Sequence, residues 1–235
     1  MKTVVSRALL LAMFCFFAVS CCHSSKHKNL SNLYQTHRVH ARDATVYVSM
    51  NIVHAEQGIH MGSGTGVAIA NDADNTFILT AGHICQPFLD PQNIISEFIV
   101  TTFENESHYA KIIAISAHHD VCLVSIPELI PIAKLAWSEP SSGDKVYYSG
   151  YPTGFYFPNL LNHFDGYMAG RDTVGDHLYN IPATGGSSGS PVYNSSGELI
   201  GLVSAVMVDF EHMTFGVGTE NIRDFLRETG YLQGR

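Results

Sequence analysis

Three polar residues stand in the order of a nucleophilic triad, each at the edge of a short apolar run. His83 ends "FILTAGH", Asp120 begins "DVCLVSI", and Ser188 lies in the turn "TGGSSGSP". A serine hydroxyl is a weak nucleophile until a neighbouring base takes its proton. Histidine can take that proton near neutral pH, and a carboxylate behind it fixes the imidazole tautomer. The three residue types in this order therefore predict acyl-transfer chemistry at Ser188.

The turn around Ser188 is rich in residues that expose backbone N–H groups. Glycines allow positive φ, and successive outward N–H groups form a concavity that binds an anion. We expect the N–H groups of Gly186 and Ser188 to form an oxyanion hole for a tetrahedral intermediate. Ser187 is the alternative serine in the same turn. Each motif alone is typical of an ordinary turn or strand end, so the prediction depends on their combination.

Short β-rich runs broken by Gly, Asn, Asp and Pro must position these residues. They recur from Ala44 onward and indicate an all-β sandwich or barrel. A proline-rich link at 127–140 divides them into two halves of similar size. The strongest helix signal comes last: Thr219 is expected to cap "ENIRDFLRE", whose apolar residues share one face.

The N-terminus carries an export signal. Lys2 and Arg7 precede "ALLLAMFCFFAV", an apolar run too short to span a bilayer comfortably, and "SCC" follows. The pattern "AVSC" resembles a bacterial lipoprotein signal with lipid attached to Cys21, although such signals more often carry Leu where Ala18 stands. We expect a signal peptide over 1–20 and a periplasmic or cell-surface, membrane-anchored protein. An ordinary signal peptide and an uncleaved anchor are the alternatives.

Residues 21–43 are polar, and this composition predicts a flexible tether. Their histidines have no regular ligand spacing; they are His23, His27, His37 and His40. We therefore expect no metal and no cofactor. The tether would place the folded domain at 44–235.

Composition and cysteine content narrow the function classes. The chain has 235 residues, of which 46% are hydrophobic and 14% charged, as in globular proteins. Its net charge of −8, with no basic cluster after the first residues, gives nucleic-acid binding little support. Cys85 and Cys122 could form one disulfide, but their apolar surroundings favour two buried free thiols.

The motifs "TAGH", "DVCLV" and "GGSSGSP" together resemble the signature regions of the trypsin-like, or chymotrypsin-fold, serine proteases. The serine loop is similar to that of glutamyl endopeptidases. The segments "GSGTGVAI", "GDKVYYSGYPTG", "GYMAGR" and "GVGTENIRDFL" resemble bacterial Deg-type proteases, over roughly 60–230. The resemblance implies two six-stranded antiparallel β-barrels, at about 44–130 and 141–218, followed by a helix at about 219–229.

The resemblance also implies roles for individual residues. His83 would be the general base, Asp120 its orienting carboxylate and Ser188 the nucleophile, with Gly186 and Ser188 as oxyanion hole. Ser204 would support the aspartate, and residues 203–206 would pair with the substrate backbone. Ser187 stands where animal-type zymogens carry the Asp that pairs with a new N-terminus, so that activation route is not expected.

Substrate preference follows from the same correspondence. The expected pocket residues are Pro182, Ala183, Val203, Ser204, Val206 and Gly216. None is charged, and the pocket histidine of glutamyl endopeptidases is replaced by Val203. We therefore expect cleavage after small or medium apolar residues of protein or peptide substrates.

Two other functions fit parts of the sequence. A non-catalytic peptide-binding or chaperone-like protein could use the same fold, because a fold does not guarantee activity. A serine esterase would need a strand–turn–helix elbow around the serine. The segments "SPVY" and "ELIGLVSAV" after Ser188 predict strands instead, which disfavours an esterase.

Overall fold

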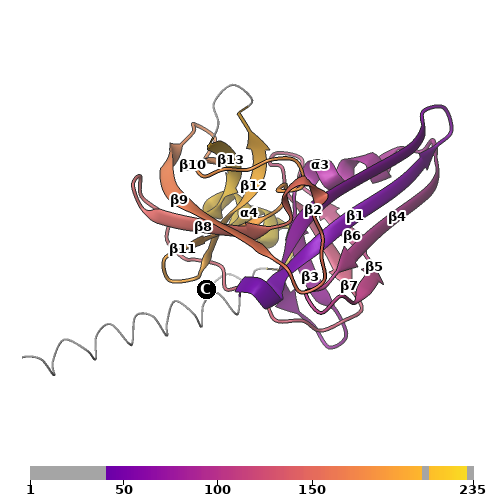
Figure 1. The fold of residues 1–235 in the computed structure, drawn as a ribbon, viewed down its shortest axis with the longest axis horizontal. Coiled ribbons are helices and arrows are strands. Elements are labelled where there is room, and N and C mark those ends of the chain that lie inside the picture. The colour runs from indigo at the N-terminus through magenta and orange to yellow at the C-terminus, as the bar shows by residue number, and fades with distance from the viewer. Residues whose placement is uncertain (1–40, 208–211, 232–235) are drawn as a thin grey trace, which may run out of the picture. The chain divides into compact units, whose positions relative to one another are not determined.

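Two antiparallel β-sheets follow each other along the chain, as the succession of short β-rich runs predicts (Figure 1). The computed structural model describes residues 41–207 and 212–231. The predicted signal peptide, Cys21 and the tether histidines lie outside the described residues. Of the predicted tether, residues 41–43 are described: they form a helical turn in which Ala41 is buried and accepts a hydrogen bond from Thr45.

The first sheet has seven strands in the order β5-β4-β1-β2-β3-β7-β6. The strands are β1 (Thr45–His54), β2 (Gly58–Asn71), β3 (Thr76–Thr80), β4 (Asn93–Thr101), β5 (Ser107–Tyr109), β6 (Lys111–Ile115) and β7 (Cys122–Ile126). A short helix α3 (Gly82–Cys85) and a 3-10 turn η1 (Gln86–Leu89) follow β3.

A bend at Ala110 brings the two edges of this sheet together. The Ala110 N–H donates to the Phe98 carbonyl of β4 at 2.8 Å, and the next residue, Lys111, already pairs with Ser125 of β7. β5 and β6 are therefore one run of chain that changes partner. Counted as a single bent strand, they reduce the sheet to the six strands that were expected.

The second sheet is a closed six-stranded barrel in the order β10-β13-β12-β11-β8-β9. Its strands are β8 (Lys145–Gly150), β9 (Asn162–Arg171), β10 (His177–Asn180), β11 (Pro191–Asn194), β12 (Leu199–Val206) and β13 (Met213–Gly218), with the 3-10 turn η2 (Pro152–Gly154) after β8. This confirms the fold class.

The terminal helix α4 (Thr219–Glu228) forms as predicted, with Ile222, Phe225 and Leu226 buried. The expected cap is wrong by one residue, since Gly218 occupies the N-cap position. Thr219 is buried, and its hydroxyl donates to the Ile200 carbonyl at 2.6 Å instead.

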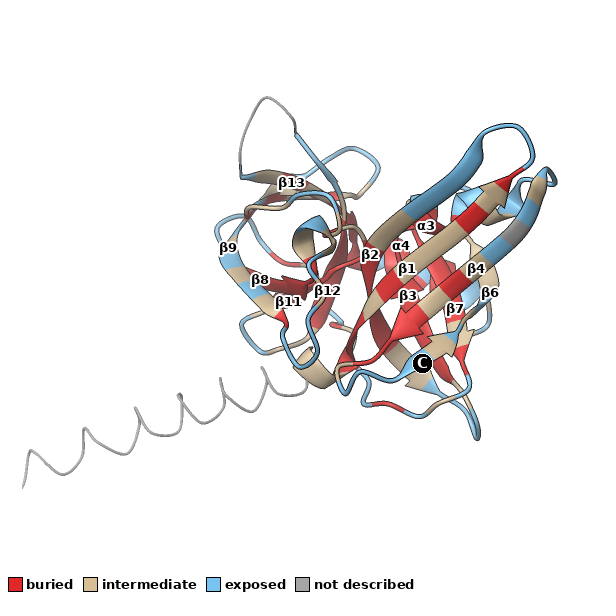
Figure 2. Ribbon diagram, turned by 45° about the vertical axis from the view of Figure 1, so that its right-hand side comes forward, coloured by how far each residue is buried: buried red, intermediate tan, exposed pale blue. Residues whose placement is uncertain are grey.

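The apolar interior is divided into two clusters (Figure 2). The larger fills the first sheet and continues through Tyr147, Tyr193 and Leu202 to α4. The smaller fills the second barrel around Tyr148, Tyr179 and other large side chains. In the two described stretches, no helix is long and apolar enough to cross a bilayer.

Candidate active site

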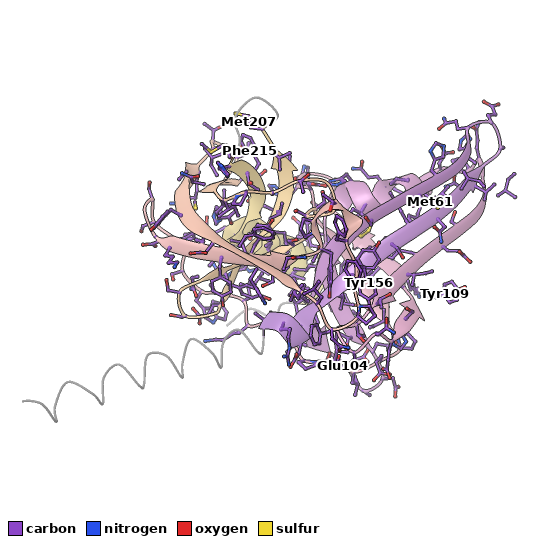
Figure 3. All side chains as sticks on the ribbon, in the orientation of Figure 1. Met61, Glu104, Tyr109, Tyr156, Met207 and Phe215 are labelled. Atoms are coloured by element: carbon purple, nitrogen blue, oxygen red, sulfur yellow. A yellow bond between two sulfur atoms is a disulfide. The ribbon has the colours of Figure 1, made fainter. Side chains whose placement is uncertain are left out.

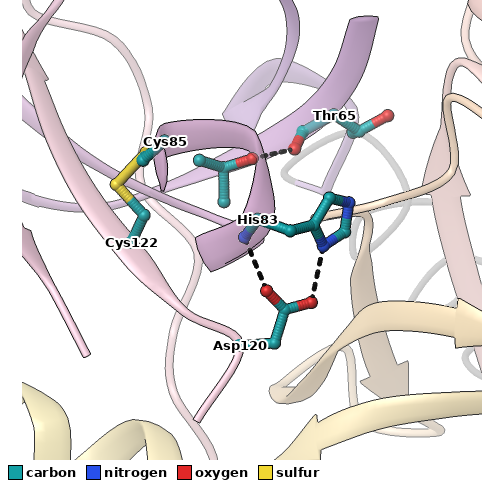
Figure 4. The surroundings of a disulfide bond; sticks show 6 residues. Thr65, His83, Cys85, Asp120 and Cys122 are labelled. Atoms are coloured by element: carbon teal, nitrogen blue, oxygen red, sulfur yellow. Dashed lines mark hydrogen bonds and ion pairs between the residues drawn. A yellow bond between two sulfur atoms is a disulfide. The ribbon is translucent and has the colours of Figure 1, made fainter. Parts of the chain in front are cut away.

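His83 lies on the short helix α3, directly after the wholly buried strand β3 (Figure 4). Its side chain is 47% exposed, so one side of the ring is open to solvent. Gly82 before it allows close approach of the Asp120 segment: a Cβ there would lie 2.9 Å from the Val121 nitrogen. The small residue in "TAGH" thus lets two distant stretches of chain meet.

Asp120 holds His83 at two points (Figure 4). Its Oδ1 accepts the His83 backbone N–H at 2.7 Å, and its Oδ2 lies 2.8 Å from His83 Nδ1. An acceptor at Nδ1 places the ring proton there and leaves Nε2 with its lone pair free. The imidazole is therefore presented as a base.

Ser204 gives Asp120 a further hydrogen bond, donated from its Oγ to Oδ2 at 2.5 Å. The β12–β13 pairing shifts register between Val203 and Ala205, so Ser204 stands at a bulge. Such bulges re-aim a side chain out of the regular alternation. Burial would raise the pKa of Asp120, but the hydrogen bonds from His83 and Ser204 and the nearby imidazole hold that pKa below its ordinary value.

A cross-link joins the segments that carry His83 and Asp120. Cys85 and Cys122 form a disulfide with their Cα atoms 6.4 Å apart, a usual separation for such a bond. The expectation of two free thiols is therefore wrong. Cys85 ends α3 and Cys122 begins β7, and the start of β7 lies beside α3 because Gly82 permits it.

The loop carrying Ser188 connects β10 to β11 and packs closely on the first sheet. Gly186 and Gly189 have φ of 86° and 79°, which glycine adopts without strain. A Cβ on Gly189 would lie 2.1 Å from the Thr65 carbonyl oxygen and 2.9 Å from the Ala81 nitrogen. Glycine at this position is thus required by both conformation and space.

Thr65 of β2 anchors this loop and was not singled out from the sequence. Its N–H donates to the Ser188 carbonyl at 2.8 Å, and its hydroxyl donates to the Gly186 carbonyl at 3.1 Å. A Cβ on the neighbouring Gly64 would lie only 3.0 Å from the Ser188 backbone carbonyl oxygen and 2.3 Å from Ile84 Cδ1. Ser188 and the residue after His83 therefore flank the same glycine. The glycines of "GSGTG" were the available signal.

The backbone of the serine loop leaves two donors free. The Gly185 carbonyl accepts a hydrogen bond from the Thr153 N–H of η2. Within residues 41–207 and 212–231, the N–H groups of Gly186 and Ser188 have no acceptor. Free, fixed N–H groups on either side of Ser187 are what an anionic oxygen requires.

Ser187 itself is turned inward. It is fully buried, and its Oγ lies 3.3 Å from the Thr184 N–H and 3.4 Å from the Tyr148 hydroxyl. Ser188, by contrast, is only partly buried. Of the two serines, Ser188 is the one within reach of solvent.

The expected pocket residues lie on two segments of the second barrel, one before the serine loop and the other on β12 and β13. Pro182 and Ala183 are partly buried before the serine loop, and Val203 is packed into the barrel core. Gly216 pairs with Val203 across β12 and β13, whereas Val206 is exposed. Val203 and Gly216 are thus neighbours on adjacent strands, and Ala183 packs against the apolar cluster that contains Val203.

Tyr148 of β8 holds the backbone at Pro182, one of the expected pocket residues. Its hydroxyl donates to the Pro182 carbonyl at 2.8 Å, and its ring stacks on Phe164 with centroids 4.8 Å apart. Burial raises the pKa of Tyr148 to about 12, so the hydroxyl keeps its proton. It therefore stays a hydrogen-bond donor throughout the physiological range.

Comparison with known proteins agrees with this geometry. Residues 64–202 match the family model of the trypsin-like peptidase domain, and no curated protein matches. Among solved structures, the serine endoprotease from Yersinia pestis has a TM-score of 0.66 at 19% identity, covering 83% of this chain and 66% of its own.

Two further structures are similar. Rv3671c from Mycobacterium tuberculosis H37Rv, a serine-to-alanine mutant in its inactive form, has a TM-score of 0.63 at 15% identity, covering 85% of this chain and 92% of its own. The HtrA-type protease AlgW, a serine-to-alanine variant with a decapeptide, has a TM-score of 0.68 at 16% identity, covering 84% and 67%. At these identities the likeness shows the fold.

A seven-stranded sheet and a closed six-stranded barrel that bring a His–Asp pair beside a glycine-rich serine loop have the architecture of the chymotrypsin fold. Since the family model covers more than half of the chain, the classification does not depend on the distant structures. The protein belongs to the trypsin-like peptidase family.

Proposed function

We propose that the chain hydrolyses peptide bonds with Ser188 as nucleophile, His83 as general base and Asp120 as the group that orients the base. The two-point hydrogen bonding of Asp120 to His83 carries this proposal. With the ring proton on Nδ1, His83 Nε2 takes the proton of Ser188 Oγ as that oxygen attacks the substrate carbonyl carbon. Asp120, ionised at neutral pH, stabilises the imidazolium that results.

The tetrahedral intermediate would place its charged oxygen at the N–H groups of Gly186 and Ser188. Neither donor has an acceptor among the described residues, so both are available when the charge develops. Collapse of the intermediate breaks the C–N bond, and the leaving amine takes the proton from His83 Nε2. Water then hydrolyses the acyl-enzyme by the same steps in reverse.

The end of β12 is the proposed partner of the substrate backbone. β11 pairs with β12 only as far as Leu202, while β13 pairs along the other edge to Val206. In the described part of the chain, no strand pairs with the free edge of 204–206. An extended peptide could add there as a further antiparallel strand, close to the serine loop.

For the residue before the cleaved bond, we propose small or medium apolar side chains. The pocket walls at Ala183, Val203 and Gly216 are uncharged, and Val203 narrows the space between them. Such pockets discriminate weakly, by about 1–3 kcal/mol per methylene, so preference rather than strict selection is expected. A peptide library should show cleavage after Val, Ala or Leu; dominant cleavage after Glu, Lys or Arg would refute this preference alone.

Covalent labelling tests the catalytic proposal directly. A fluorophosphonate probe should label the wild-type chain and the Ser187→Ala variant, but not Ser188→Ala, because only an activated serine attacks it. Ser187→Ala is the matched control, since it removes a hydroxyl from the same turn. Failure of the folded wild-type chain to label would contradict the triad and favour a peptide-binding role.

We propose further that the enzyme works outside the cytoplasm, attached through lipid on Cys21. The basic and apolar N-terminal pattern and "AVSC" support this, and so does the disulfide, since such bonds persist in oxidising compartments. Radiolabelled palmitate should enter the wild-type protein in bacterial cells and not Cys21→Ala. Labelling that survives the substitution would refute attachment at this residue.

A further inference from the structure

A second cluster of chemically active side chains lies where the first sheet closes. Glu106, His108 and Glu128 each offer one ligand atom, and these atoms lie within 4.8 Å of one another. Glu106 and His108 flank the start of β5, and Glu128 follows β7. We propose that these three residues bind a divalent transition-metal ion, with Zn²⁺ as the preferred ion.

The backbone fixes all three residues before any ion arrives. In Figure 3 the exposed side chain of Tyr109 marks the place of β5. His108, on the opposite face of that strand, is partly buried, and Glu106 directly precedes the strand. The Glu106 carbonyl accepts the Thr102 N–H at 2.9 Å. The Glu128 carbonyl accepts the hydroxyl of buried Thr76 at 2.6 Å. The backbone therefore needs little further ordering for binding, whereas the side chain of exposed Glu106 has still to be ordered.

Among the residues that the structure describes, these side chains have no other partner. His108 Nε2 is shielded from solvent and finds no hydrogen-bond partner there. No lysine or arginine of residues 41–207 or 212–231 forms an ion pair with Glu106 or Glu128. Two carboxylates at this separation repel each other, and a buried imidazole nitrogen without a partner is unfavourable. A bound cation removes both costs.

The donor set selects the class of metal. Imidazole nitrogen and carboxylate oxygen are both ligand types that Zn²⁺ accepts, and the remaining positions are open to water. Ca²⁺ and Mg²⁺ prefer oxygen ligands only, so the histidine disfavours them. The ion would connect β5 to the segment after β7, on the two sides of the bend at Ala110.

Metal titration of the full chain tests the site. The chelator-treated protein is titrated with Zn²⁺ by calorimetry and with Co²⁺ by visible absorption, because Co²⁺ reports a histidine-containing ligand set by its d–d bands. The Zn²⁺ ion that binds most tightly to wild type should bind at least tenfold more weakly to His108→Gln and to Glu128→Gln. Both variants should also lose the Co²⁺ d–d band. Since other histidines can bind zinc weakly, His60→Gln, an exposed histidine on the β1–β2 hairpin, is the control and should behave as wild type.

Melting without metal shows whether each variant is folded. If His108→Gln melts lower than wild type, exposed Glu106→Gln serves in its place. Zinc should raise the melting temperature of wild type and His60→Gln, and not that of the site variants. Equal zinc affinity in wild type and site variants would overturn the proposal, and so would a preference for Ca²⁺ over Zn²⁺.

Discussion

Removal of the Cys85–Cys122 disulfide should lower the free energy of unfolding substantially. The bond closes a loop with a sequence separation of 37 residues. A disulfide stabilises the folded state by restricting the unfolded chain, and for a loop of this length the stabilisation is about 4 kcal/mol at 25 °C. Breaking the bond removes this contribution to the free energy of unfolding. For a domain of this size that corresponds to a fall in Tm of roughly 10 °C.

Urea unfolding followed by fluorescence measures this loss. Cys85→Ala with Cys122→Ala removes the bond together with two buried sulfurs, whereas wild type in reducing buffer keeps the sulfurs and loses only the cross-link. Reduction of wild type should cause most of the decrease in unfolding free energy. The double variant should show a smaller further decrease, because it also leaves cavities where the sulfurs were.

The same experiment separates stability from catalysis. Asp120 holds His83 by two hydrogen bonds of its own, so kcat/KM of the folded, reduced enzyme should fall less than tenfold. A decrease in unfolding free energy below about 1 kcal/mol in the reduced protein would refute the loop-entropy reasoning. A large loss of kcat/KM without loss of stability would show instead that the bond positions His83.

Three other substitutions probe the hydrogen bonds and close approaches of the site. Ser204→Ala removes a hydrogen bond to a charged group, so kcat/KM should fall about tenfold to a hundredfold, since such bonds contribute about 1.5–3 kcal/mol. The same variant should unfold in acid at higher pH: the depressed pKa of Asp120 contributes stability above its unfolded-state pKa, which is lost as pH falls through the folded value. Gly189→Ala should lower Tm strongly by a backbone clash, whereas Gly185→Ala, with open space around its Cβ position, should not. Tyr148→Phe should raise KM more than it lowers kcat in peptide-cleavage assays, because it loosens the pocket wall at Pro182 without touching the proposed nucleophile.

The sequence was sufficient for those features that depend on residue type and order. Short β-rich runs predicted an all-β sandwich or barrel, and the resemblance carried by "TAGH" and "DVCLV" implied the His83–Asp120 contact that the structure contains. The disulfide was missed because two cysteines 37 residues apart meet only through tertiary packing. Local apolar surroundings are the same for a buried thiol and a buried half-cystine.

Two other features depend on backbone contacts that no local pattern records. Thr65 anchors the serine loop through a neighbour 121 positions away, and only the flanking glycines hinted at the close approach. Thr219 has the type of a helix cap, but burial directs its hydroxyl to the Ile200 carbonyl, and Gly218 takes the cap position. In both cases tertiary packing decides which partner a hydroxyl finds.

The bend at Ala110 also affects how copies of this protein behave toward each other. An edge strand presents unpaired N–H and C=O groups on which another chain can build. Here one run of chain, β5 with β6, occupies both edges of the first sheet, and the second sheet closes on itself. Because β5 has three residues and β6 five, both edges of the first sheet offer only a short ladder on which another copy could build.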